Sequence, residues 1–442
     1  MIKRLLIISA FTGTAYLSNI FALKYLIGSV PLSSIKAVGV IDSLFNLVIN
    51  LLSAGLLMAS VRDIAASEDW RTYFQKAQQA RITAGFLLII PALLGILDWS
   101  YFFLASAPVF ALNGDYGLYG RGKPVIASFN AFYRTLIPAI LLVVCAVYWK
   151  QGLLFTYAAS SIIMYFISGI SISKILNVPY WFTPSLASLK LYVSSINLGI
   201  VSLGYYFLGL GLFIITPFFY TESVTALAYV GLKFYIIFKG VLRIINQAFI
   251  YDMLNEEVCK KVDHIATIAG LTFLVTTTAF TNSFISFFFN ENIADQNTWL
   301  ILIGICGFLI CPLISLTTSA ILEKKDKPYA RLSLFAIITS TISCILFSFW
   351  QNNITGILLS LILGEMICII GLILLLKKIP LLTERAAFIF KNLSLAILPL
   401  SIRWIYGDNI YTLWIGGGTY SLLMLLLNYK HLNLKYHGAT IK

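Results

Sequence analysis

Long apolar stretches alternate with short polar ones along the whole chain. Fourteen stretches approach or exceed the roughly 20 apolar residues that a helix needs to cross a bilayer. They cover residues 5–27, 33–60, 82–98, 100–119, 124–148, 152–173, 191–215, 223–249, 265–288, 299–321, 332–350, 355–376, 388–406 and 410–428. The pattern predicts an all-α polytopic membrane protein with 12–14 transmembrane helices, in which 388–406 and 410–428 are the weakest candidates.

Basic residues concentrate in alternate connections between these segments. If the N-terminus lies inside, nearly all loop lysines and arginines fall in cytoplasmic loops, and the outer loops hold only Lys150. This asymmetry follows the positive-inside rule and predicts a multi-pass protein with both termini cytoplasmic. The net charge of +13 is then explained by orientation and contact with anionic membrane lipids. No nucleic-acid partner is expected.

Two short sequence matches indicate an internal repeat. LYGRGKP (118–124) and LEKKDKP (322–328) both end a hydrophobic segment, six segments apart, and both place a proline at the start of the next one. Parallel repeats of this kind recur in transporters. We therefore expect an N-terminal six-helix lobe (1–178), a cytoplasmic linker (179–190), a C-terminal six-helix lobe (191–378), and two additional helices with a cytoplasmic tail (379–442).

The sequence offers little for catalysis. No phosphate-binding loop of the G-x-x-x-x-G-K-[ST] type is present, and the three histidines, His264, His431 and His437, fall at the cytoplasmic edge of predicted helices. The six cysteines show no spacing typical of a disulfide framework or a metal site. The outer loops are too short to form an active site. We expect a protein that is not an enzyme and has no cofactor or metal, with a membrane enzyme of glycan assembly as an alternative.

Polar side chains repeat at helical spacing on four of the predicted helices. In the first twelve of these helices we count six cations against two carboxylates. On 223–249, Lys233, Lys239, Arg243 and Tyr229 share one arc of the helical wheel. The other stripe residues are Tyr16 and Asn19 on 5–27, Asp42, Asn46 and Asn50 on 33–60, and Arg134 on 124–148. Polar residues at membrane depth face a bundle interior or a water-filled cavity. The stripes therefore predict a hydrated cavity between the lobes.

The predicted cavity carries an excess of positive charge. Its cations are Lys24, Lys36, Arg134, Lys233, Lys239 and Arg243, against the carboxylates Asp42 and Glu365. Lysine and arginine are the residues that recognise phosphate, so the cargo is expected to be anionic. Lys24, Lys36 and Arg243 could instead extend to the membrane surface. Asp42 and Glu365 could neutralise a nearby cation, or could bind H⁺ or Na⁺ as coupling ions.

The six-plus-six pattern, the basic turn at 120–124 and SAGLLMASVR (53–62) resemble the polysaccharide flippases of the multidrug/oligosaccharidyl-lipid/polysaccharide exporter superfamily, with the Wzx-type O-antigen flippases as the nearest branch. The resemblance covers about residues 1–378. It implies a location in the bacterial inner membrane and a V-shaped two-lobe fold. Such a protein moves undecaprenyl-pyrophosphate-linked oligosaccharide from the cytoplasmic to the periplasmic leaflet by alternating access. It would work beside other membrane proteins of polysaccharide assembly. It also implies that basic residues on the first, second and eighth helices line the cavity: Lys24, Lys36, Lys233, Lys239 and Arg243. A multidrug or cation antiporter of the same superfamily is the alternative, and it would need carboxylates as its main cavity charges.

Overall fold

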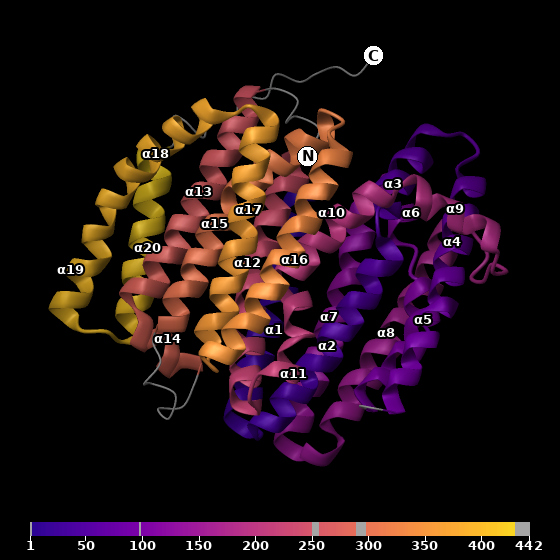
Figure 1. Ribbon diagram of the computed structural model, residues 1–442, viewed down its shortest axis with the longest axis horizontal. Helices are drawn as coiled ribbons and strands as arrows, with labels where there is room; N and C mark the ends of the chain where they lie inside the picture. The colour runs from indigo at the N-terminus through magenta and orange to yellow at the C-terminus, as the bar shows by residue number, and fades with distance from the viewer. Residues whose placement is uncertain (1, 97–98, 250–255, 289–297, 429–442) are drawn as a thin grey trace. The chain divides into compact units, whose positions relative to one another are not determined.

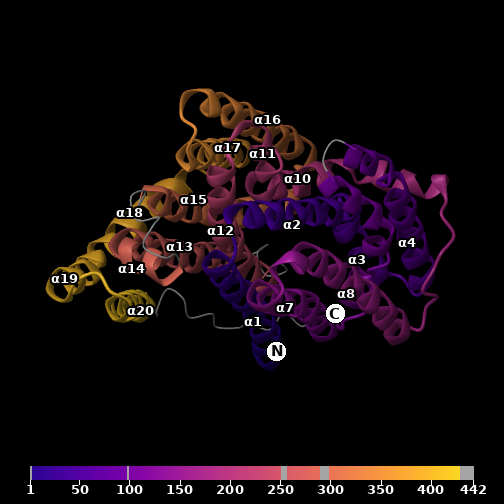
Figure 2. The same cartoon turned by 90° about the horizontal axis from the view of Figure 1, so that it is seen from below.

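The computed structural model describes residues 2–96, 99–249, 256–288 and 298–428, and these residues contain helices and no strands. They form two compact units (Figures 1 and 2). Unit 1 comprises Met1–Lys233 and Ser333–Ile357, and unit 2 comprises Phe234–Leu332 and Leu358–Lys442. Each unit therefore combines segments that are far apart in the sequence. The expected lobe boundaries at residues 178, 190 and 378 stay a prediction.

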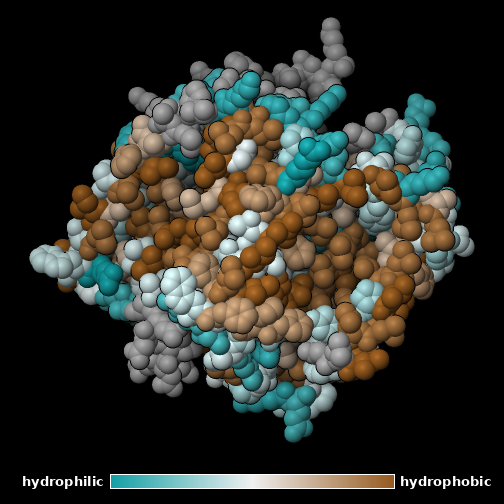
Figure 3. All heavy atoms as spheres, viewed as in Figure 1, coloured by the Kyte–Doolittle hydropathy of each residue, from teal (hydrophilic) through white to brown (hydrophobic). Residues whose placement is uncertain are grey.

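The predicted fold class is confirmed. Among the described residues, 11 helices are long and apolar enough to cross a membrane, and a pair bent by 75°, Leu186–Ser194 with Ile196–Gly211, brings the number to 12. Large exposed apolar side chains such as Ile140, Phe155 and Trp350 cover the outsides of these helices. On the face shown in Figure 3, hydrophobic side chains cover the middle and hydrophilic ones lie mainly toward the upper and lower edges. This distribution suits contact with lipid.

Unit 1 contains most of the N-terminal helices. They are α1 (Ile2–Ser29), α2 (Leu32–Ser53), α3 (Leu56–Ala66), α4 (Trp70–Leu87), α5 (Ala107–Ala111), α6 (Asp115–Gly120), α7 (Pro124–Tyr148), α8 (Leu153–Leu176), α9 (Lys190–Ser194), α10 (Ile196–Tyr206) and α11 (Thr216–Phe219). The first half of α12 (Glu222–Phe249) and most of α16 (Asp326–Trp350) complete it. Its hydrophobic core is built mainly from α2, α4, α5, α6 and α8.

Several of the segments expected to be single helices are broken, and two of these breaks lie in unit 1 before residue 120. The segment 33–60 divides into α2 and α3 at Gly55, which has φ +73° and whose absent Cβ would lie 2.4 Å from the carbonyl oxygen of Ser195. Only glycine tolerates both conditions. The segment 100–119 divides into the 3₁₀ helix Trp99–Ser106, α5 and α6, with the break at 112–114. Neither segment therefore forms one continuous helix.

Unit 2 contains the second half of α12 and most of the C-terminal helices. They are α13 (Glu256–Ala279), α14 (Thr281–Phe288), α15 (Thr298–Leu322), α17 (Ile354–Leu376), α18 (Ile379–Leu393), α19 (Ile397–Tyr406) and α20 (Ile410–Leu427). A buried ion pair between Arg385 and Asp263, with 2.9 Å between Nη1 and Oδ1, joins α18 to α13. Both halves of the predicted final pair of helices, 388–406 and 410–428, are therefore present and packed in unit 2.

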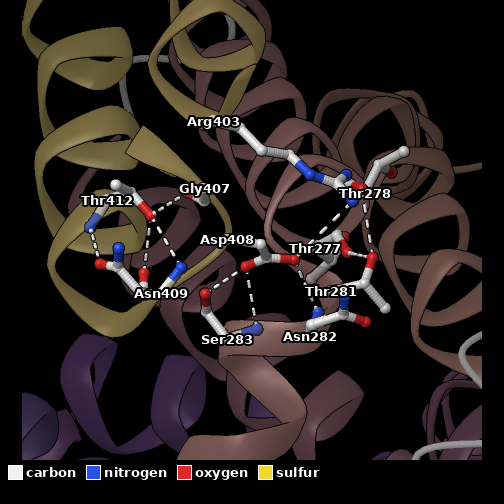
Figure 4. Close-up of polar contacts among 10 residues, drawn as sticks. All are labelled: Thr277, Thr278, Thr281, Asn282, Ser283, Arg403, Gly407, Asp408, Asn409 and Thr412. Carbon is white, nitrogen blue, oxygen red and sulfur yellow. Dashed lines mark hydrogen bonds and ion pairs between the residues drawn. The ribbon is translucent and has the colours of Figure 1, made fainter. Parts of the chain in front are cut away.

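The turn between α19 and α20 is fixed to the start of α14 (Figure 4). The carboxylate of Asp408 accepts hydrogen bonds from the backbone N–H groups of Asn282 and Ser283, each at 3.0 Å. The next residue, Asn409, caps α20 together with Thr412. Two adjacent residues thus satisfy the free N–H groups at the beginnings of two helices. The junction of α13 with α14 and the turn between α19 and α20 are therefore in direct contact in unit 2.

Candidate functional site

The polar stripe of α2 meets the first cation of α12 inside unit 1. Lys233 Nζ donates to Asp42 Oδ2 at 2.5 Å, and the two side chains are 13% and 9% exposed. Asp42 Oδ1 also accepts from the Tyr157 hydroxyl at 2.9 Å and from Asn46 Nδ2 at 3.2 Å, and Oδ2 accepts from the Tyr229 hydroxyl at 3.2 Å. One carboxylate therefore holds four donors, of which only Lys233 carries a charge.

Close packing between α2 and α12 sets the position of these groups. A Cβ on Gly39 would lie 2.7 Å from the ring of Tyr229 and 2.9 Å from Phe213. Gly39 is three residues before Asp42, on the same face of α2. The missing side chain lets the Tyr229 ring lie directly against α2, which brings its hydroxyl to Asp42.

Lys233 also borders a small cavity in unit 1. Asn19 of α1, Tyr157 of α8 and Tyr229 of α12 line it together with Lys233, and apolar residues of α1 and α7 complete the wall. Its volume is about 20 Å³, which suffices for one water molecule. The structure thus brings together five of the predicted site residues: Asp42, Asn46, Asn19, Tyr229 and Lys233.

The second lysine of α12 has a separate partner in unit 2. Lys239 Nζ donates to Glu365 Oε1 at 3.1 Å, and the side chains are only 2% and 1% exposed. The Tyr235 hydroxyl donates to the same carboxylate oxygen, and the ammonium lies 5.2 Å from the centre of the Tyr235 ring. Because both charges are buried and paired, this group has the character of a structural ion pair.

Arg134 is paired as well. Its Nη2 donates to Asp115 Oδ2 at 2.5 Å, its Nη1 donates to Ser168 Oγ at 3.0 Å, and the guanidinium lies 4.8 Å from the centre of the Tyr165 ring. Asp115 lies at the first position of α6, directly after the break at 112–114. Sequence reasoning missed Asp115, although it falls inside the predicted segment 100–119 and should have been counted there.

The remaining predicted site residues lie apart from the Lys233 cavity, and two of the predicted asparagines bond to their own helices. Asn50 and Asn19 donate to the backbone oxygens of Asn46 and Ala15, one turn earlier. Tyr16, Lys24 and Lys36 are half-buried and do not line the cavity. Arg243 belongs to α12, but its side chain lies outside the described residues.

The charge balance differs from the one expected. Lys233, Lys239 and Arg134 each have a carboxylate partner, so three of the six predicted cavity cations are neutralised. The argument from a bare cationic excess is wrong for these three, because Asp115 was omitted and because Asp42 and Glu365 pair directly with the lysines. Of the roles considered for the two carboxylates, neutralisation of a nearby cation is the one that the geometry shows.

No protein-family model matches the chain, and no curated protein matches its sequence. Several solved structures match almost its full length. The lipid II flippase MurJ in an inward closed conformation is 14% identical with a TM-score of 0.72, over 97% of this chain and 100% of that chain. An inward-facing multidrug resistance MATE family transporter of the MOP superfamily is 15% identical with a TM-score of 0.64, over 86% of this chain and 99% of that chain. A eukaryotic MATE transporter is 15% identical with a TM-score of 0.56, over 85% and 95%. These likenesses show the fold: this chain has the architecture of the MurJ and MATE structures.

Proposed function

We propose that this protein is a flippase for undecaprenyl-pyrophosphate-linked oligosaccharides, which it moves from the cytoplasmic to the periplasmic leaflet for the assembly of O-antigen or another surface polysaccharide. The observation that carries the proposal is the position of Lys233. It is a partly exposed cation at membrane depth, it borders a cavity that Asn19, Tyr157 and Tyr229 also line, and it is held by a carboxylate with other donors. A buried charge of this kind marks a substrate or ion pathway. A fold shared with a lipid II flippase supports the same reading.

The proposed mechanism is an exchange of partners at Lys233. An incoming pyrophosphate carries more negative charge than the Asp42 carboxylate and competes for the same ammonium group. When Lys233 leaves, Asp42 keeps its hydrogen bonds from Tyr157, Tyr229 and Asn46, so it does not become an unsatisfied buried charge. Asp42 can then take a proton or Na⁺, which would couple cargo binding to ion movement.

The other predicted cations have different roles in this proposal. Arg134 is less buried than Lys239 and lies in unit 1, so it is the next candidate for phosphate. Lys24, Lys36 and Arg243 would attract the anionic head group toward the cavity. Lys239 with Glu365 would hold α12 against α17, which leaves Glu365 as the weaker candidate for ion coupling.

The membrane potential offers a driving force that needs no nucleotide. Moving one negative charge outward across an inside-negative membrane releases about 2.3 kcal/mol per 100 mV. A pyrophosphate-linked cargo would gain this energy directly. Ion exchange through Asp42 would add to it.

A multidrug or cation antiporter is the second candidate. The observation that favours it is that a carboxylate, Asp42, is the centre of the hydrogen-bond network in unit 1. In that case Lys233 would act only as a counter-ion that a cationic substrate displaces. The two functions differ in their response to loss of the cation, because an antiporter without Lys233 keeps its substrate-binding carboxylate, whereas the flippase loses its phosphate ligand.

The test is complementation of a flippase-deficient strain that still makes the lipid-linked oligosaccharide. Wild-type protein is expected to restore surface glycan, and Lys233→Ala is expected to leave the lipid-linked intermediate inside. Export of cationic dyes by the wild-type protein, without any recovery of surface glycan, would support the antiporter and contradict the flippase.

A further inference from the structure

Arg81 is a buried cation that the proposed mechanism does not use. It lies on α4, about 16 Å along the helix from Trp70, and is only 4% exposed. Phe74 and Gln78 precede it by seven and three residues and are buried too, so Arg81 belongs to the inward face of α4. It is therefore part of the interior of unit 1.

Arg81 differs from the other deep cations of unit 1 in its partners. Lys233 pairs with Asp42 and Arg134 pairs with Asp115. Within the part of the chain that the structure describes, Arg81 makes no ion pair, and its Nε is buried without a hydrogen-bond partner. Arginine does not lose its proton in proteins. The charge therefore stays in the interior of unit 1 without a counter-charge.

The polar groups around Arg81 are engaged with each other. The guanidinium lies 5.4 Å from the centre of the Tyr116 ring, but the Tyr116 hydroxyl donates to Gln78 Oε1 at 2.7 Å. Gln78 Nε2 in turn donates to the backbone oxygen of Ala111 at 3.0 Å. The aromatic face thus provides the only described stabilisation of the charge. The Nε–H edge of the fork has no hydrogen-bond partner among the described residues.

We infer that Arg81 binds a phosphate group carried by a membrane lipid. The Nε and Nη N–H groups of an arginine form a fork that matches two oxygens of a phosphate, and an unpartnered Nε leaves one edge of that fork open. The exposed residues just before and at the start of α4 are of both signs: Glu68, Asp69, Arg71 and Lys76. The attraction for a phosphate therefore rests on Arg81 itself. The inference does not depend on the proposed function, because either a bilayer phospholipid or a prenyl diphosphate supplies the same group.

The experiment measures ligand-induced thermal stabilisation of the full-length protein in a neutral detergent. The probes are dioleoylphosphatidylglycerol and farnesyl diphosphate, with dioleoylglycerol and farnesol as phosphate-free counterparts. The variants are Arg81→Gln, Arg81→Lys and, as a matched control, Arg121→Gln, which removes an exposed arginine from the same end of unit 1. Arg81→Lys keeps the charge but loses the fork of N–H groups. It therefore still tests the inference if Arg81→Gln does not fold.

We expect at least one phosphate-bearing probe to stabilise the wild type and Arg121→Gln, and the phosphate-free counterparts not to do so. Both Arg81 variants are expected to need about tenfold or more higher probe concentration for the same shift. A loss confined to phosphatidylglycerol identifies a bilayer lipid, and a loss confined to farnesyl diphosphate identifies a prenyl diphosphate. Wild-type protein that responds to neither probe, or Arg81 variants that respond like the wild type, would overturn the inference.

Discussion

Lys233 donates to Asp42 at 2.5 Å within a network in which the carboxylate has three further, uncharged donors. The lysine depends on this carboxylate for its counter-charge, whereas the carboxylate does not depend on the lysine for all of its hydrogen bonds. This asymmetry makes Lys233 the partner that can leave. It distinguishes the pair from Lys239 and Glu365, which are almost completely buried.

The two ion pairs of α12 should therefore respond differently to mutation. Lys239→Met leaves Glu365 buried and charged beside a single tyrosine donor, and breaking a buried pair in this way costs about 3–5 kcal/mol. The double variant Lys239→Met/Glu365→Leu removes both charges and is expected to recover most of the loss. Thermal unfolding of purified protein measures both effects. Equal stability of Lys239→Met and wild type would show that the pair is not a structural element.

Lys233→Met is the matched comparison and is expected to cost less, because Asp42 keeps three donors after the lysine is removed. A larger loss of stability for Lys233→Met than for Lys239→Met would contradict the proposed difference between the two pairs.

Gly39 should control the geometry of the site. A valine there needs space that the Tyr229 ring and Phe213 occupy, so Gly39→Val is expected to displace the Tyr229 hydroxyl from Asp42 and to lower transport about tenfold or more at similar protein level. Gly13 of α1 has no atom within 4 Å of its absent Cβ, and Gly13→Ala is the control. Surface-glycan assays of both variants provide the measurement, and unaffected transport by Gly39→Val would show that Tyr229 need not be held in place.

Asp408 should hold the first turn of α14. Asp408→Ala removes the acceptor for the N–H groups of Asn282 and Ser283, a loss worth about 0.5–2 kcal/mol for a helix cap. Amide hydrogen exchange at 282–285 is expected to accelerate. Asn409→Ala is the control, since it removes the cap of α20 and should accelerate exchange at 411–413 instead. Identical exchange of α14 in wild type and Asp408→Ala would contradict this assignment.

The orientation in the membrane can be tested on a single helix. Arg121 and Lys150 are exposed residues just outside opposite ends of α7. All six native cysteines are buried, so the native background should label weakly. Arg121→Cys is expected to react with a membrane-impermeant maleimide only after the inner membrane is opened, and Lys150→Cys is expected to react in intact spheroplasts. The reverse pattern would invert the proposed topology.

Much of the fold followed from hydrophobic patterning alone, because a bilayer demands long apolar helices. All fourteen predicted segments overlap helices, but the breaks at Gly55 and at 112–114 were missed. A glycine forced into φ +73° by a neighbouring backbone carries no hydropathy signal, and neither does a turn between two apolar helices.

The sequence predicted many residues of the site, but it did not predict which of them pair with each other. The spacing placed Lys233 and Lys239 on one broad face, but six residues along a helix leave two side chains about 120° apart around its axis, so the two lysines differ enough in direction to have different partners. Periodicity within one helix identifies which residues face inward. Which helix meets which depends on tertiary packing, and for this reason Asp42 with Tyr157 and Arg134 with Asp115 could not be paired in advance.

Surface glycan produced by Lys233→Ala in a flippase-deficient strain tests the central claim most directly, provided that protein level and thermal stability are measured alongside. The account predicts normal folded protein, accumulation of the lipid-linked intermediate and a fall in surface glycan of about tenfold or more. A fall of this size corresponds to the loss of one charged ligand that contributes about 1.4 kcal/mol or more to cargo binding. Wild-type surface glycan from Lys233→Ala at a normal protein level would contradict the claim that Lys233 binds the cargo.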